Sequence, residues 1–189
     1  MAAGFSKRLG RDKALIEVGG RPLVSVMAQM MKNHGLRVCV VSSNQWDEGS
    51  VPLFGAINCI NPNPERGRTG SIKCGLSALR WPKRVIVAPI DRPGFSSETL
   101  RRLIDSEICT CPSNGGRGGH PILLDESAVE AVRNAAPDTP LRDLCTPLRF
   151  EVEDRHMSLN IDTEDDVQIL RSEWPEIESS WKVHAYPEQ

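Results

Sequence analysis

Residues 84–93 read RVIVAPIDRP, and this stretch decides the expected fold of the chain. The run from Arg84 to Ile90 is nearly all apolar, which predicts a buried strand. Asp91 follows the strand directly. In an open α/β sheet, ligands bind beyond the carboxyl ends of the strands. Asp91 is therefore expected either at the ligand edge of a sheet, as a Mg²⁺ ligand, or as an ordinary turn residue before Arg92-Pro93.

Segments with strand and helix patterns alternate along the rest of the chain. This alternation predicts a three-layer α/β/α fold in which helices cover both faces of a mostly parallel, Rossmann-like sheet. We expect a single domain over residues 1–189, with an aperiodic tail from 174 to 189. Strands are predicted at 37–43, 55–62, 84–90, 108–111, 120–124 and 149–154, and helices at 23–34, 71–80, 96–106, 126–135 and 163–173.

Composition narrows the class of protein. The 189 residues carry a formal net charge of −2, whereas nucleic-acid binders usually have a basic excess. No apolar run approaches the ~20 residues that span a bilayer, and the N-terminus has no apolar segment of a secretory signal. We therefore expect a cytoplasmic protein with no nucleic-acid or membrane partner, whose six cysteines are reduced thiols rather than disulfides or a zinc site.

The opening, residues 2–13, reads AAGFSKRLGRDK and is a candidate phosphate-binding loop. It matches neither the P-loop pattern nor GxGxxG. Backbone N–H groups together with Ser6, Arg8 and Lys13 could converge on phosphate oxygens, and the two basic side chains would offset charge during phosphoryl transfer. The alternative is a solvated basic loop.

Three further segments are candidate sites. Asn160 and Asp162 alternate along an extended segment, so both could face one hard cation, although Asp162 could simply help to cap the following helix. Thr163 is its expected N-cap, with Asp166 three residues on. The glycine-rich loops at 67–71 and 115–121 suit the close approach of a ligand. His120 is either an acid/base or substrate contact, or a structural histidine.

Taken together, these motifs resemble the MobA-like nucleotidyltransferase family, which includes molybdenum cofactor cytidylyltransferases and guanylyltransferases. The opening is similar to that family's glycine turn followed by R-x-G-x-x-K. The other matching segments, in the family's order and up to about residue 170, are GRTGSIKCGLSAL (67–79), VIVAPIDRP (85–93), GRGGHPILL (116–124), LRDLC (141–145) and NIDTEDD (160–166).

The resemblance implies a nucleotide-diphospho-sugar transferase type of fold and a Mg²⁺-dependent nucleotidyl transfer. A phosphorylated acceptor such as molybdopterin would attack the α-phosphate of an NTP and release pyrophosphate. The opening Ala-Ala-Gly favours CTP, and a molybdoenzyme or a chaperone is a conceivable partner. The implied residues are Arg8, Lys13 and Asp91 for catalysis; Asp91, Asn160 and Asp162 for the metal; Ala2, Ala3, Gly4, Ser6, Gly70 and Ser71 for the nucleotide; and Gly118, Gly119 and His120 for the acceptor.

One departure from the family concerns its first strand. The family's signature follows an apolar central strand, whereas only Met1 precedes Ala2 here. Either the start is assigned too late, which we favour, or the sheet lacks that strand. The alternative functions are a sugar-phosphate, inositol-phosphate or isoprenoid-precursor nucleotidyltransferase, and a non-catalytic nucleotide-binding accessory module. A dinucleotide-dependent oxidoreductase is disfavoured because GxGxxG is missing.

Overall fold

The computed structural model of the chain describes residues 1–2, 9–43, 46 and 50–182. Its helices are α1 (Leu23–Asn33), α2 (Arg68–Ala78), α3 (Ser97–Asp105), α4 (Glu126–Asn134) and α5 (Glu164–Ser180). Its strands are β1 (Glu17–Val18), β2 (Arg21–Pro22), β3 (Cys39–Ser42), β4 (Ile57–Ile60), β5 (Val85–Val87), β6 (Thr110–Asn114), β7 (Arg117–Gly118), β8 (Ile122–Leu124) and β9 (Leu148–Glu151).

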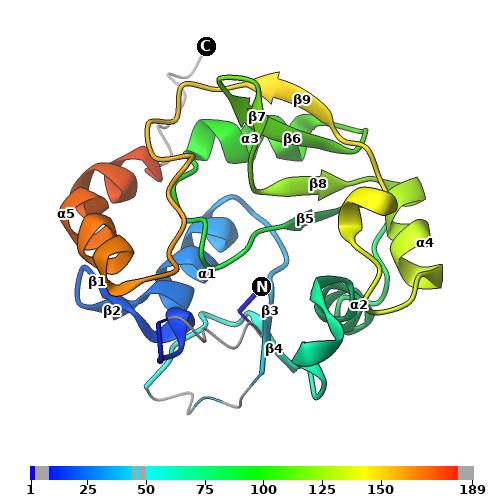
Figure 1. Ribbon diagram of the computed structural model, residues 1–189, viewed down its shortest axis with the longest axis horizontal. Coiled ribbons are helices and arrows are strands. Elements are labelled where there is room, and N and C mark those ends of the chain that lie inside the picture. Colours follow the sequence, from blue (N-terminus) through cyan, green and yellow to red (C-terminus); the bar gives the residue numbers. More distant parts are fainter. Residues whose placement is uncertain (3–8, 44–45, 47–49, 183–189) are drawn as a thin grey trace.

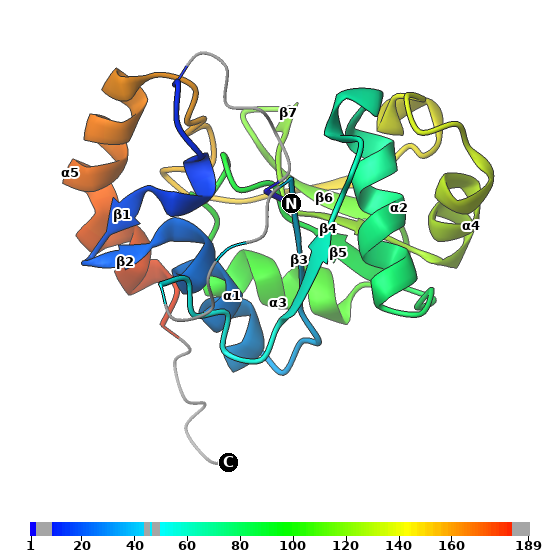
Figure 2. The ribbon, with the colours of Figure 1, turned by 90° about the horizontal axis from the view of Figure 1, so that it is seen from below.

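Helices cover both faces of the strands, which confirms the predicted α/β fold (Figures 1 and 2). On one face, α1, α3 and α5 bury Leu23, Leu100 and Leu170 in a common core. On the other face, α2 and α4 bury Leu76 and Val132 against β5 and β8. Burial of these side chains supplies most of the force that holds the helices to the sheet.

The pairing of the strands is more mixed than the predicted parallel sheet. β3 pairs in parallel with β4, and β6 pairs in parallel with β9. However, β8 runs antiparallel to both β5 and β6. The reason lies in the connection: the chain reverses through Gly115 and Gly116, both with positive φ, and returns as β7 along β6. Such a short connection can join only antiparallel strands, because a parallel pair requires a long crossover.

The first two residues lie between β3 and β5. Ala2 forms a parallel bridge with Ser42, next to the end of β3. The carbonyl oxygen of Met1 accepts a hydrogen bond from the amide of Ile90, which follows β5. These two residues connect the β3–β4 pair to the larger sheet at the position expected for the family's first strand.

The last helix is longer than its sequence pattern predicts. Its start agrees with prediction, because Thr163 and Asp166 form a reciprocal capping box. Its end does not, because α5 continues through Pro175 to Ser180. The side chains of Trp174, Ile177 and Trp181 are buried in the core, and that burial compensates for the proline. Residues 183–189 lie outside the described part of the chain.

Two expectations from composition can be compared with the structure. None of the described helices has the length and apolar character that crossing a bilayer requires. All six cysteines are free thiols; Cys111 is buried and the other five are partly buried. Burial raises the pKa of the Cys39 and Cys109 thiols to about 12. Such thiols stay protonated and unreactive at neutral pH.

Replacing Gly94 by alanine should destabilise the folded chain. A Cβ atom at Gly94 would lie 1.9 Å from the carbonyl oxygen of His156, and neither backbone can yield without moving its neighbours. We expect Gly94→Ala to lower the free energy of unfolding by about 3 kcal/mol, measured by urea denaturation. Gly20→Ala is the control, because Gly20 has open space but a positive φ, a cost of about 1–2 kcal/mol. Equal losses in the two variants would contradict the steric argument.

Candidate active site

Lys13, Asp91 and Asp162 come together at the ligand edge of the sheet, although they lie far apart in the sequence. The Nζ atom of Lys13 lies 2.8 Å from Oδ1 of Asp162 and 3.8 Å from Oδ2 of Asp91. The three side chains are 12%, 19% and 27% exposed, in the order Lys13, Asp162, Asp91, so each is accessible to a small ligand. The sequence predicted these residues separately, and the fold makes them one cluster.

Local structure around Lys13 fixes its backbone. The carboxylate of Asp12 accepts a hydrogen bond from the amide of Ala14, at 2.9 Å, and so caps a 3₁₀ turn over Lys13–Leu15. The other oxygen of Asp12 accepts from the indole nitrogen of Trp46 at 3.2 Å. Ala14 is fully buried, so the backbone of the turn is anchored in the core. Sequence reasoning missed Asp12, although its place immediately before the turn is typical of a cap.

The segment that carries Asp162 is tied to Asp91 through the backbone. The amide of Ile161 donates to the carbonyl oxygen of Asp91 at 3.0 Å, and Ile161 is fully buried. One oxygen of Asp166 accepts from the amides of Asp162 and Thr163 at the start of α5. These hydrogen bonds hold the pKa of Asp166 below its usual value. Asp166 is thus a structural residue, as predicted, and it fixes the position of Asp162.

The donor set at this cluster fits a hard divalent cation. Asp91 and Asp162 supply carboxylate oxygens, which Mg²⁺ prefers. The amide nitrogen of Asn160 donates to Oδ2 of Asp162 at 2.6 Å, which leaves the amide oxygen of Asn160 as a third ligand atom. The ammonium group of Lys13 contacts both carboxylates. A cation and Lys13 therefore interact with the same oxygens.

A cavity of about 210 Å³ extends from Lys13 and Asp91 toward the N-terminus of α2. Its lining includes Ala2, Arg68 and Ser71. No side chain caps α2. The amide of Gly70 in its first turn donates to the carbonyl oxygen of Pro137 at 2.9 Å, so an anion here would interact with the positive end of the helix and with the amides that precede Gly70. The hydroxyl of Ser71 accepts from the side-chain amide of Asn61 at 3.0 Å, which orients it. A triphosphate could lie between this helix end and Lys13.

Two of the predicted glycine contacts serve packing in the structure. Gly70 packs against Pro137: a Cβ atom added at Gly70 would lie 3.1 Å from the Cβ of Pro137. Gly70 does not line the cavity. At Gly119, a Cβ would lie 2.8 Å from the sulfur of Met157. Gly118 lies beside the guanidinium of Arg149. The glycines allow close packing here, and their proposed contacts with ligands stay predictions.

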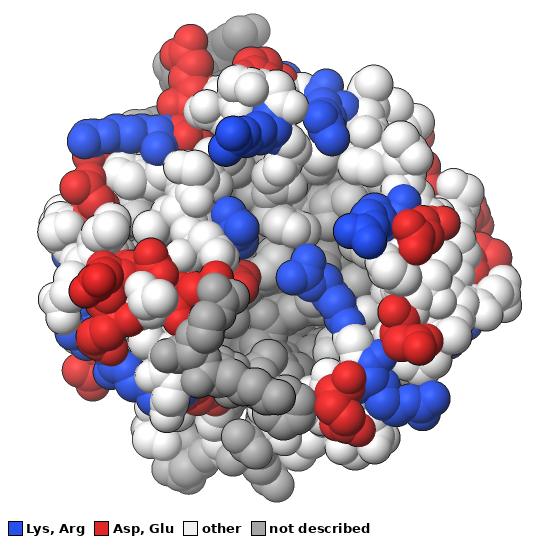
Figure 3. Space-filling model, viewed as in Figure 1, with Lys and Arg blue, Asp and Glu red and all other residues white. Residues whose placement is uncertain are grey.

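His120 lies near Asp91 in a basic environment. Burial, followed by the nearby charges of Arg68 and Arg92, lowers the pKa of His120 to about 4. Its buried Nδ1 atom has no hydrogen-bond partner among the described residues. Figure 3 shows Lys and Arg side chains around a hollow on this face of the molecule. The sequence analysis did not identify Arg68 and Arg92 as site residues. Arg68 lies within GRTGS and Arg92 directly follows Asp91, and these positions could have indicated them.

Part of the predicted site cannot be placed. Ala3, Gly4, Ser6 and Arg8 lie outside the described residues. Ala2 is buried at the edge of the cavity, and its amide donates to the carbonyl oxygen of Val41 at 2.7 Å. Their roles toward the nucleotide stay predictions.

Acidification should destabilise the protein through His120. Its pKa is about 4 in the folded chain and 6.5 when exposed, so the unfolded state binds the proton more tightly. The contribution of neutral His120 to the free energy of unfolding is therefore complete above about pH 6.5. As the pH falls to 4, the free energy of unfolding decreases by about 3 kcal/mol. Urea denaturation at several pH values should show a smaller decrease in the free energy of unfolding for His120→Gln, because glutamine cannot titrate. The same pH dependence in both proteins would contradict this role.

Comparisons with known proteins place the chain among its relatives. The sequence model of the MobA-like NTP transferase domain matches residues 1–153. The molybdenum cofactor guanylyltransferase of Xanthomonas euvesicatoria is 30% identical over 104 residues, which cover 55% of this chain and 51% of that protein. The nicotine blue oxidoreductase of Paenarthrobacter nicotinovorans is 32% identical over 146 residues, which cover 70% of this chain and 72% of that protein.

A solved structure shares the fold. The homolog of Mycobacterium tuberculosis Rv0371c from Mycobacterium sp. strain JC1 superposes with a TM-score of 0.73 at 21% identity. The superposition covers 93% of this chain and 94% of that chain. The α/β architecture is therefore shared over nearly the whole chain.

Proposed function

This chain belongs to the MobA-like NTP transferase family, and on that premise we propose that it is a nucleotidyltransferase. It transfers a nucleoside monophosphate from an NTP to a phosphorylated small-molecule acceptor. An oxygen of the acceptor phosphate attacks the α-phosphorus, the bond to the β-phosphate oxygen breaks, and pyrophosphate leaves. No covalent intermediate with the protein is required, because positioning and electrostatics are sufficient for this chemistry.

The observation that carries this proposal is the position of Lys13. Its ammonium group, 2.8 Å from Asp162 and 3.8 Å from Asp91, lies at the cavity that leads to the N-terminus of α2. From there Lys13 neutralises charge on the triphosphate as the leaving group separates, and the α2 amides hold phosphate oxygens. Arg8 adds a second positive charge from the opening loop.

Asp91, Asn160 and Asp162 hold Mg²⁺ in this proposal. A bound ion would offset the negative charge of the phosphate groups. Asp91 and Asp162 also keep Lys13 oriented before the nucleotide arrives. The nucleoside lies against Ala2, Ala3, Gly4, Ser6 and the Gly70-Ser71 turn, in which Ser71 lines the cavity and Gly70 packs under Pro137. The acceptor lies toward Gly118, Gly119 and His120.

Neutral His120 suits the acceptor side of the site. With a pKa of about 4, it carries no charge at neutral pH and can donate or accept one hydrogen bond at its buried Nδ1. Arg68 and Arg92 supply the positive charge beside it that a phosphorylated acceptor requires. We propose molybdopterin as the acceptor, in keeping with the name of the Xanthomonas relative, molybdenum cofactor guanylyltransferase. A molybdoenzyme or a chaperone is the partner in this proposal.

A pyrophosphate-release screen tests the proposal. The chain is mixed with each of the four NTPs, Mg²⁺, and either molybdopterin, a sugar 1-phosphate or inositol phosphate. We expect release that depends on both metal and acceptor. Calorimetric binding of NTP without any release would favour a non-catalytic nucleotide-binding module. Reduction of nicotine blue without release would favour the activity that the Paenarthrobacter relative is named for.

We further expect CTP to bind about 10-fold more tightly than GTP, which corresponds to ~1.4 kcal/mol. The expectation comes from the sequence: Ala3, which lies outside the described residues, has a small side chain that would leave room for the edge of a pyrimidine. Ala3→Gly should reduce the ratio of the CTP affinity to the GTP affinity, because glycine would increase the conformational freedom of the backbone at this position. Competition titration with CTP, GTP, ATP and UTP measures both effects. Tighter binding of GTP would overturn the preference and leave the nucleotidyltransferase proposal standing.

A further inference from the structure

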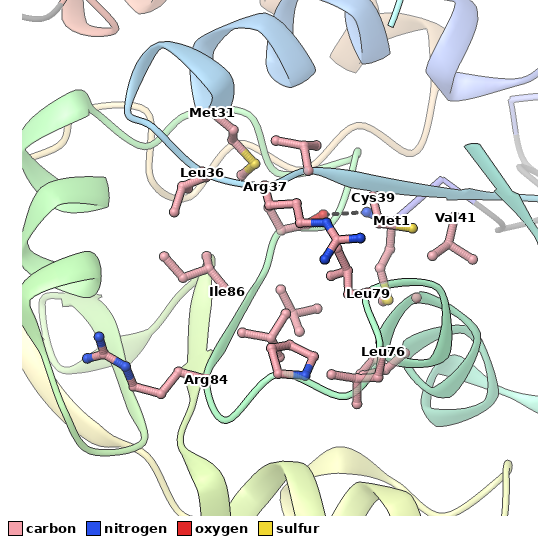
Figure 4. A pocket seen from close by; sticks show the side chains of 17 residues that line it. Met1, Met31, Leu36, Arg37, Cys39, Val41, Leu76, Leu79, Arg84 and Ile86 are labelled. Carbon is pink, nitrogen blue, oxygen red and sulfur yellow. Dashed lines mark hydrogen bonds between the residues drawn. The ribbon is translucent and has the colours of Figure 1, made fainter. Parts of the chain in front are cut away.

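Two features outside the proposed active site differ in the ligands they suit. A cavity of about 290 Å³ lies between β3 and β5, with Met31 of α1 and Leu76 of α2 on opposite sides of it (Figure 4). Its lining is mostly apolar, so it offers few partners to a charged ligand. Metal-ligating side chains gather elsewhere, between α5 and the segment that follows β9. There His156, Glu173 and Glu176 place one ligand atom each within 4.8 Å of one another.

The ligand atoms of this group already lie close together. Nε2 of His156 is 3.0 Å from Oε2 of Glu173 and 3.9 Å from Oε2 of Glu176. The first residue of α5 is Glu164, nine residues before Glu173, which corresponds to about 14 Å along the helix. The group is therefore separate from Asp162 and the proposed magnesium site at the start of α5.

The backbone around His156 fixes the imidazole beside the helix. The carbonyl oxygen of His156 accepts from the amide of Leu159 at 2.9 Å, and the amide of Met157 donates to Asp154 at 3.0 Å. Gly94 packs directly against the backbone of His156, where a Cβ atom would not fit. The His156 side chain is only 14% exposed. Little conformational entropy is therefore lost when the imidazole binds an ion.

The two carboxylates project from one side of α5. Residues three apart in sequence are neighbours on the surface of a helix, and Glu173 and Glu176 have this spacing. Trp174 and Ile177 are buried in the core, which holds the helix in place. The carboxylate side chains are 32% and 52% exposed, so an ion can reach them from solvent.

The separations and the donor types suit zinc. With metal–ligand distances of about 2.0–2.2 Å, two ligands of a tetrahedral Zn²⁺ are about 3.4 Å apart. The separations of 3.0 and 3.9 Å lie on either side of this value. An imidazole nitrogen with two carboxylate oxygens is a donor set that zinc accepts, whereas Mg²⁺ prefers oxygen ligands alone.

Nearby donors occupy the same carboxylate oxygens. The hydrogen bond with His156 lowers the pKa of Glu173, so this carboxylate is ionised at neutral pH. Nη1 of Arg155 lies 2.9 Å from Oε2 of Glu176, the oxygen that also faces His156. The Arg155 side chain is 69% exposed and can move into solvent. Arg155 is thus a competitor of a cation for this oxygen.

We propose that His156, Glu173 and Glu176 bind one Zn²⁺ ion, with a fourth position open to water. The ion is held by the unprotonated Nε2 of His156 and by one oxygen of each carboxylate, and Arg155 is displaced from Glu176. It clamps the segment after β9 to α5. It also stabilises the folded chain, because the unfolded chain does not hold the three ligands together.

Calorimetric titration of the reduced chain with Zn²⁺ tests the proposal. We expect His156→Gln and Glu176→Gln each to lower the affinity of one zinc site by about 100-fold or more. Glutamine can form a hydrogen bond at either position but is not among the side chains that bind zinc. Zinc held by cysteines or at the proposed magnesium site is unaffected by these changes, so the difference between the titrations isolates this site.

Two further variants separate the zinc site from general charge effects. Glu178→Gln is the matched control, because Glu178 is an exposed carboxylate of the same helix that pairs with Arg21. Its zinc affinity should equal that of the unmodified chain. Arg155→Met should raise the affinity by about two- to fivefold, since it removes a competing exposed ion pair. At roughly a hundredfold excess of Zn²⁺ over its Kd, the thermal midpoint should rise by about 5 °C in the unmodified chain and not in His156→Gln.

Other outcomes overturn the proposal. Equal zinc affinities of the unmodified chain, His156→Gln and Glu176→Gln would leave the three side chains as a hydrogen-bonded contact of α5. Zinc uptake that requires dimerisation, measured by sedimentation, would exclude a clamp within one chain. The Glu176 side chain is 52% exposed, so Glu176→Gln keeps the fold and decides the question even where His156→Gln unfolds. None of these readouts requires turnover, so they are independent of the proposed function.

Discussion

Asp91→Ala should reduce Mg²⁺-dependent turnover by roughly 10²–10³-fold, the cost of removing one group that stabilises developing charge at an active site. The carboxylate lies beyond β5, contacts Lys13 and is 27% exposed, so its loss would remove the proposed metal ligand and little core packing. Pyrophosphate release at saturating NTP measures the effect, and circular dichroism and the thermal midpoint report on the fold.

Asp165→Ala is the matched control for this variant. Asp165 lies in the first turn of α5, close in sequence to Asp162, but its side chain is exposed. The turnover of Asp165→Ala should stay near that of the unmodified chain. Full activity of Asp91→Ala, with an intact fold, would exclude Asp91 from the metal site.

Lys13→Met should lower kcat by roughly 10²–10³-fold and change the KM for the NTP much less. Methionine keeps the apolar stem of the side chain, so the 3₁₀ turn and its packing stay in place. An ammonium group that matters most as charge develops in the transition state affects kcat beyond KM. Initial rates over a range of NTP concentrations separate the two constants.

Arg11→Met provides the control, since Arg11 lies in the same segment and forms an exposed ion pair with Glu164 on α5. Exposed pairs of this kind contribute little to stability. A rise in the KM of Lys13→Met at unchanged kcat would make Lys13 a simple binding residue.

Much of the fold could be predicted from local patterns. The apolar run before Asp91 forms β5, and Thr163 caps α5. Both could be predicted because they depend on residues that are close in the sequence. The antiparallel position of β8 could not be predicted, since it follows from a glycine-rich connection that the pattern of strands does not reveal. The extension of α5 to Ser180 depends on burial of Trp174 against distant segments, which no local periodicity reports.

The candidate site divides in the same way. Local patterns identified three candidates: Lys13 in the basic, glycine-containing opening, Asp91 after an apolar strand, and Asp162 in an extended segment. Their mutual contacts depend on the backbone hydrogen bond between Ile161 and Asp91, a tertiary feature. The glycines have a second role that local patterns do not reveal. Gly70 and Gly119 stay predicted ligand contacts, and their neighbours in space, Pro137 and Met157, also require them to be small.

The contact of Lys13 with both carboxylates has a thermodynamic consequence. In the proposed site, the ammonium group would compete with a divalent cation for the oxygens of Asp91 and Asp162. Phosphate oxygens of a nucleotide would attract the same ammonium group and release the carboxylates from it. If the proposed function holds, metal and nucleotide should therefore bind with positive coupling, each raising the affinity of the other by the same factor. The nucleotide would then enter the site together with its metal.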